Sequence, residues 1–129
     1  MKIAAAYIRV STEDQTDYSP AVQLGDILAY ASKNGYHIPQ EFIFADEGIS
    51  GRSADKRPAF QDMVRAARKK ANRIEAILVH KYDRFARSKD DAVLYKALLK
   101  KDGVKVISIK EPIPQDDKFA VIYESMLEA

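Results

Sequence analysis

One continuous apolar run constrains the fold more than any other feature of this sequence: "EAILVH", from Glu75 to His80. A strand with one wet face alternates apolar and polar residues, whereas a strand buried on both faces is apolar throughout. Strands of the second kind belong to parallel sheets that carry helices on both sides. The run therefore predicts the middle of such a sheet.

The rest of the chain alternates between strand-like and helical patterns. Further strands are expected at Lys2 to Val10, Glu41 to Ala45 and Val104 to Ile109. Helices are expected from Ser19-Pro20 to Gly35, from Pro58 onward, from within Asp83 to Lys89 until Asp102-Gly103, and over Phe119 to Leu127. Strands that alternate with helices predict an α/β fold with a doubly wound, mostly parallel central sheet flanked by helices.

Length and composition narrow the classes of function. The 129 residues suit one domain, and the 47% of hydrophobic residues suffice for a core. The chain has no cysteine and only two histidines, His37 and His80, so we expect no disulfide, no cysteine nucleophile and no metal site. No stretch approaches the ~18 apolar residues of a membrane span. The net charge of +2 says little about partners.

The predicted topology brings distant polar residues to one place. Ligands of doubly wound sheets bind beyond the carboxyl ends of the strands. If the strands that end near Val10 and His80 are neighbours, as in a 2-1-3-4 order, the segments that follow them face one crevice. That crevice would hold Arg9, Ser11, Asp83, Arg84 and Arg87, and the long loop from Asp46 to Arg57 would add Ser50 and Arg57.

Several arginines around one serine indicate a phosphate ligand. Guanidinium groups offer paired, planar donors and stay charged at neutral pH. A phosphoryl group under attack spreads negative charge over its oxygens, and fixed cations stabilise that transition state.

Each residue also has a simpler interpretation. Ser11 can end a strand, Arg9 can lie on the exposed face of an edge strand, and Gln23 can be a solvated helix position. Asp83 can be an N-cap, or it can form an ion pair at i,i+4 with Arg87 that is worth only ~0.3 kcal/mol.

Three other features of the sequence also have a simpler interpretation than a functional site. His80 is expected to end its strand as a neutral, hydrogen-bonded histidine. The basic stretch Arg65 to Arg73 is expected to be a wet helix face, and "GISG" a turn. Only the convergence of several residues at one edge of the sheet favours a functional site.

Four motifs occur in the order and spacing of a known family: "YIRVSTEDQ", "SPAVQLGDILAYA", "DEGISGRSADKRPAF" and "VHKYDRFARS". Through them the chain resembles the serine recombinases of the resolvase/invertase family, most of all the large serine recombinase branch. The resemblance implies a resolvase-like catalytic domain over residues 1–129, with DNA-binding domains further along the natural chain. It also implies double-stranded DNA as substrate, self-association into dimers and tetramers in the full-length protein, and no cofactor. It implies a bacterial cytoplasm or a phage or mobile element as the setting.

The resemblance also implies roles for individual residues. Ser11 matches the nucleophile that attacks a DNA phosphodiester and forms a 5′-phosphoserine link, without ATP. The arginines that match phosphate-binding positions are Arg9, Arg57, Arg84 and Arg87, and the other matching active-site residues are Gln23, Ser50, Asp83 and, less closely, Asp46. Asp83 could transfer a proton for Ser11 or only orient arginines, since a guanidinium cannot serve as the base. A fragment without DNA-binding domains is expected to be inactive on DNA.

Other classes of function stay open on the residues alone. A serine hydrolase or phosphatase would need a base, usually histidine, and often a "G-x-S-x-G" elbow, which Ser11 lacks. A nucleotide-binding module would need a glycine-rich loop, but "VSTEDQ" has no glycine. A regulatory or interaction domain would leave the arginines scattered in space.

Overall fold

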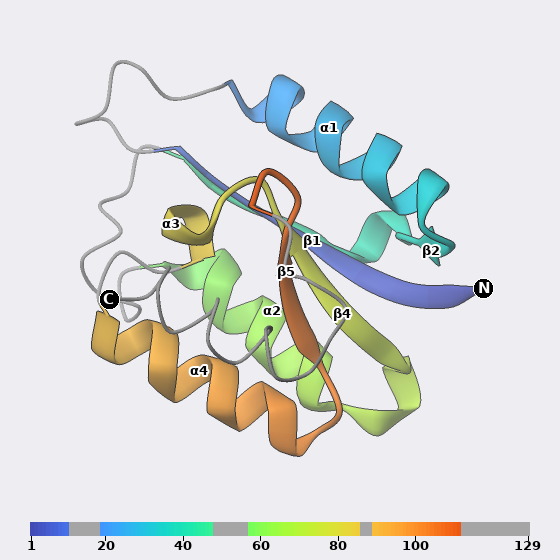
Figure 1. Cartoon of the computed structure of the whole chain (residues 1–129). Helices are drawn as coiled ribbons and strands as arrows, with labels where there is room; N and C mark the ends of the chain where they lie inside the picture. Colours follow the sequence, from blue (N-terminus) through green and yellow to red (C-terminus); the bar gives the residue numbers. More distant parts are fainter. Residues whose placement is uncertain (11–18, 48–56, 86–88, 112–129) are drawn as a thin grey trace.

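The structure, a computed structural model, describes residues 1–10, 19–47, 57–85 and 89–111. Its core is a sheet whose paired strands all run parallel (Figure 1). The strands are β1 (Lys2–Val10), β2 (Tyr36–His37), β3 (Ile43–Glu47), β4 (Ile74–Val79) and β5 (Lys105–Ser108). Their order is β2-β1-β4-β5, and β3 also pairs with β1. The predicted neighbours, β1 and β4, therefore do lie side by side.

Helices cover both faces of this sheet, as the doubly wound prediction requires. Helix α1 (Pro20–Lys33) lies on one face, and α2 (Pro58–Arg68) and α4 (Lys89–Lys101) lie on the other, with the short α3 (Tyr82–Phe85) after β4 (Figure 1). Two turns of 3₁₀-helix, η1 (Gln40–Phe42) and η3 (Lys70–Asn72), complete the described elements. The predicted helix over Phe119 to Leu127 lies outside the described residues.

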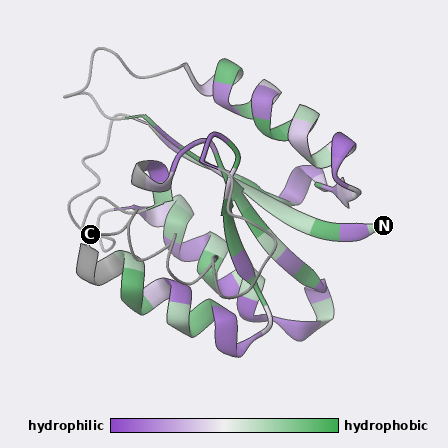
Figure 2. Ribbon diagram, viewed as in Figure 1, coloured by the Kyte–Doolittle hydropathy of each residue, from purple (hydrophilic) through white to green (hydrophobic). Residues whose placement is uncertain are grey.

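Alternate residues of β1 separate two hydrophobic cores. Ala5 and Tyr7 face α2 and α4, whereas Ala4, Ala6 and Ile8 face α1. Both sets are buried because β1 has strands on either side of it and helices above and below. Figure 2 shows mostly hydrophobic colour on the inner strands, whereas the helices carry hydrophobic and polar colour in alternation.

The first helix begins and ends where its sequence predicts. The Ser19 hydroxyl accepts a hydrogen bond from the amide of Val22 at 3.2 Å, and Pro20 occupies the first turn. After the helix, Gly35 adopts a left-handed φ of 78°, a conformation that glycine reaches without strain.

Two features differ from the predictions. The strand β2 is only two residues long, too short to leave a periodic pattern in the sequence. The stretch Arg65 to Arg73 is not one helix face: α2 ends at Arg68, and η3 follows and ends on Arg73 with a left-handed φ of 56°. The helix ends there because Lys69 turns extended, with a ψ of 111°.

Candidate active site at the carboxyl edge of the sheet

Arg9 is the last buried residue of β1 and lies at the carboxyl edge, which we define as the C-terminal ends of β1, β3 and β4. Its side chain is 0% exposed, and its strand register pairs it with Asp46 on β3. Because side chains alternate along a strand, Arg9 points to the same face as Tyr7. The interpretation of Arg9 as the exposed face of an edge strand is therefore wrong, since β1 is flanked on both sides.

Gln23 lies against Arg9 from the other layer. Its side chain is 0% exposed, and its Nε2 donates a hydrogen bond to the backbone carbonyl of Arg9 at 3.3 Å. The expectation of a solvated helix position is wrong, because α1 turns this residue toward the sheet. The contact places a predicted site residue of α1 beside a predicted site residue of β1.

A buried carboxylate organises the α2 side of this edge. Asp46 accepts hydrogen bonds from the Tyr7 hydroxyl at 2.7 Å and from the amides of Ala59 and Phe60, both at 3.0 Å. The amides belong to the first turn of α2, where free N–H groups favour an anion. Asp46 thus joins the ends of β1 and β3 to the start of α2.

Arg57 completes this cluster and is also fully buried. Its Nη1 donates to the backbone carbonyl of Phe85 at 2.6 Å and reaches the Tyr7 hydroxyl at 3.5 Å. Its guanidinium lies 4.0 Å from the centre of the Phe60 ring, a cation–π distance. In this arrangement Arg57 ties the start of α2 to the end of α3.

Tyr7 is a buried participant that sequence reasoning missed. Burial raises its pKa well above the usual range, with the hydrogen bond to Asp46 acting in the same direction, so the phenol keeps its proton at neutral pH. It therefore serves as a donor and not as a base. Its place two residues before Arg9, on the same face of β1, is the signal that could have indicated it.

We expect Asp46→Ala to lower the free energy of unfolding by about 3 to 5 kcal/mol, because it leaves a buried hydroxyl and two amides without their acceptor. Urea unfolding measures the change. Asp62→Ala is the matched control: Asp62 also lies in α2, but its side chain is exposed and forms an ion pair with the exposed Arg65. A loss for Asp46→Ala no larger than the control's would contradict the role assigned to this carboxylate.

Arg84 lies near the carboxyl edge, in the segment that follows β4. It lies in α3, is 6% exposed, and its amide donates to the carbonyl of Lys81 at 3.0 Å. Helix α3 packs against β1, and its Phe85 carbonyl holds Arg57. The structure therefore gathers the described predicted arginines, which are Arg9, Arg57 and Arg84, at the carboxyl edge. These three arginines are therefore not scattered over the fold, as a regulatory or interaction domain would have required.

Ser11, Ser50 and Arg87 lie outside the described residues, and of Asp83 only the backbone, in α3, is described. Their roles stay predictions.

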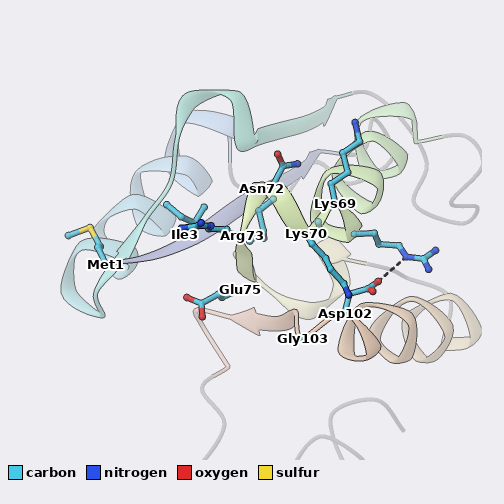
Figure 3. A pocket seen from close by; sticks show the side chains of 12 residues that line it. Met1, Ile3, Lys69, Lys70, Asn72, Arg73, Glu75, Asp102 and Gly103 are labelled. Carbon is cyan, nitrogen blue, oxygen red and sulfur yellow. Dashed lines mark hydrogen bonds and ion pairs between the residues drawn. The ribbon is translucent and has the colours of Figure 1, made fainter.

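A hollow lies at the opposite end of the sheet (Figure 3). It measures about 750 Å³ and is lined by the end of α2, by η3, by the starts of β1 and β4 and by the turn after α4. Its cations do not converge: Arg68 is paired with Asp102 at 2.9 Å, and Lys69 and Arg73 point in different directions (Figure 3). We therefore assign it no role as a phosphate site.

Within the described ranges, no helix is long and apolar enough to cross a membrane. The same residues hold no group of three or more histidines, aspartates or glutamates spaced to bind a metal ion.

The parallel sheet with buried arginines at its carboxyl edge defines a class of α/β domains, and comparison with known proteins identifies the family. Residues 4–129 match the family model described as "Resolvase, N terminal domain". The chain therefore belongs to the resolvase family: it is a serine recombinase catalytic domain, a domain of site-specific DNA recombination. No curated protein sequence matches it.

Solved structures agree with this assignment. The N-terminal catalytic domain of TP901-1 integrase is 28% identical, with a TM-score of 0.78 over 97% of this chain and 93% of that one. A resolvase family site-specific recombinase from Streptococcus pneumoniae is 27% identical, with a TM-score of 0.78 over 99% and 87%. The C-terminal catalytic domain of ISC1926 TnpA, an IS607-like serine recombinase, shares the fold at 20% identity, with a TM-score of 0.70 over 96% and 78%.

Proposed function

We propose that this domain breaks and rejoins double-stranded DNA through a covalent link to Ser11. The Ser11 oxygen attacks the phosphorus of a phosphodiester, the bond to the 3′ oxygen breaks, and a 5′-phosphoserine and a free 3′-hydroxyl result. A group near Ser11 takes the serine proton, and the departing 3′ oxygen gains one. One phosphate ester replaces another, so the reverse step needs no ATP.

The observation that carries this proposal is the burial of Arg9 and Arg84 at the sheet edge where β1 leads into the segment that holds Ser11. Fixed guanidinium groups bind phosphate oxygens in pairs. Arginines held by a packed fold need no reorganisation when charge develops on the phosphate, and this preorganisation lowers the barrier. Arg87, Ser50 and Asp83 belong to the same site in this proposal.

Arg57 has two possible functions within the same proposal. In the structure it connects α2 to α3: its guanidinium donates a hydrogen bond to the Phe85 carbonyl and packs on the Phe60 ring. To contact a phosphate directly, its guanidinium would have to leave these partners. We propose that Arg57 first positions α3, and with it Arg84.

We further propose that residues 1–129 supply the chemistry while other domains of the same protein select the DNA site and bring protomers together. The match to an N-terminal family domain and a net charge of only +2 support this division. The reaction takes place where cellular or phage DNA is found, in the cytoplasm.

The test is covalent capture. The full-length recombinase is mixed with double-stranded fragments of its host genome, denatured and purified, and the attached DNA ends are sequenced. We expect fragments joined through their 5′ ends, with mass spectrometry placing the phosphate on Ser11. Absence of any denaturation-resistant adduct, or a modified residue other than Ser11, would refute the proposal.

The serine hydrolase or phosphatase alternative gains no support from the structure. The Nε2 atom of His80 lies 2.9 Å from Oδ2 of Asp26 on α1, so this histidine already has a carboxylate partner. Turnover of p-nitrophenyl phosphate or p-nitrophenyl acetate by the isolated domain, lost in Ser11→Ala, would favour that alternative over strand exchange.

A further inference from the structure

The buried His80 and the partly exposed Asp26 form a hydrogen-bonded pair that has no role in the proposed reaction. His80 is 0% exposed at the end of β4, and its Nε2 lies 2.9 Å from Oδ2 of Asp26 on α1. The Asp26 side chain is 39% exposed. His80 was expected to be a neutral histidine at the end of a strand; the structure adds that its partner is a carboxylate from a different layer.

A third residue fixes the same carboxylate. The Lys110 ammonium lies 3.5 Å from Oδ2 of Asp26, and the Lys110 amide donates to the His80 carbonyl at 3.2 Å. The hydrogen bond from His80 and the charge of Lys110 hold the pKa of Asp26 below its usual value, so the carboxylate is ionised at neutral pH. The residues that follow β4 and β5 thus both contact α1 through the side chain of Asp26.

Helix α1 has little buried apolar surface in its first half. Its buried apolar residues, Ile27 and Ala31, lie in the second half, whereas in the first half Leu24 is only partly buried against the core and the fully buried residue is the polar Gln23. Gln23 and Asp26 are three residues apart and therefore share one side of the helix. Each makes a polar contact with the sheet, Gln23 with the Arg9 carbonyl and Asp26 with His80.

We propose that the His80–Asp26 pair positions the first half of α1, and with it Gln23, against Arg9 at the carboxyl edge. His80 and Asp26 are positioning residues, because they act through Gln23 and touch no reacting atom. The same pair connects α1 to the segment after β4 that carries Arg84. The functional part of this inference rests on the proposed strand exchange, whereas the structural part does not.

The first experiment needs no DNA. Amide hydrogen exchange is measured on the 129-residue chain for wild type, Asp26→Ala and His80→Leu. One lost hydrogen bond to a charged group should speed exchange of the amides at residues 23–26 by about tenfold, whereas exchange at residues 28–33 should stay within about twofold. Asp26 is half-exposed, so Asp26→Ala leaves the core filled even if His80→Leu fails to fold.

A matched control and a conservative variant separate positioning from general loosening. His37, the other histidine of the chain, is exposed on β2, and His37→Leu should change neither region. His80→Gln keeps an N–H donor near the position of Nε2 and should restore slow exchange at residues 23–26. Unchanged exchange in Asp26→Ala, or equal acceleration along all of α1, would overturn the proposal.

The second experiment uses the full-length recombinase and the captured DNA. We expect Asp26→Ala to slow adduct formation by about tenfold, and His80→Gln to be closer to wild type than His80→Leu. If wild type forms no adduct, the proposed function fails, while the exchange result still decides the structural part. If adduct forms at the wild-type rate despite faster exchange at residues 23–26, the link from this pair to the active site is refuted.

Discussion

Ser11→Ala is expected to abolish the covalent protein–DNA adduct completely. Alanine has no side-chain oxygen to attack phosphorus. A water molecule that attacked in its place would hydrolyse the phosphodiester and leave no covalent link to the protein. Binding of DNA should change little, since no charge is removed. The measurement is the adduct band on a denaturing gel, together with affinity from fluorescence anisotropy at one stated salt concentration.

Ser32→Ala is the matched control for this substitution. Ser32 is an exposed residue near the end of α1, outside the four quoted motifs, and its variant should form adduct at the wild-type level. Adduct at the wild-type level in Ser11→Ala would identify a different nucleophile. The assignment of Ser11 as the nucleophile would then be wrong even though the family is established.

Arg9→Lys carries the second largest expected effect, a fall of about 10²- to 10³-fold in the rate of adduct formation. Lysine keeps the positive charge but loses the planar pair of donors that matches two phosphate oxygens. At a fully buried position the ammonium also cannot reproduce the packing of the guanidinium. A rapid-quench time course of adduct formation measures the rate.

Arg65→Lys provides the comparison at an exposed arginine of α2. It should leave both rate and stability near the wild-type values. Urea unfolding of Arg9→Lys distinguishes a local catalytic loss from a damaged fold, since the rate must fall in protein that is still folded. A rate within about threefold of wild type would contradict the assignment of Arg9 as a phosphate-binding arginine.

The elements that depend only on neighbouring residues could be predicted from the sequence. The Ser19-Pro20 start of α1 and its stop at Gly35 follow from capping chemistry and a left-handed turn, which involve only neighbouring residues. The apolar run of β4 predicted a strand buried on both faces, and Ile77 and Val79 are indeed buried in one core while Ala76 and Leu78 are buried in the other. The two-residue β2 was missed because a pairing that short depends on β1 alone.

The site was only partly predictable. Motif order led to Arg9, Arg84 and Gln23, but sequence patterns alone favoured solvent exposure for both Gln23 and Arg9, and both are buried. The layer that a side chain faces depends on how α1 packs on the sheet. Tyr7 escaped notice for the same kind of reason, because its partner Asp46 is 39 residues away and meets it only through the β1–β3 pairing.

By itself the sequence determined the alternation of strands and helices, the doubly wound class and the motif order that leads to the resolvase family. These follow from local propensity, burial periodicity and residue identity. Only the tertiary structure decided that Arg9 and Arg57 are buried, that Asp46 joins three elements, and that His80 holds α1 through Asp26. Those contacts join residues far apart in the chain, and their geometry exists only once the layers have packed.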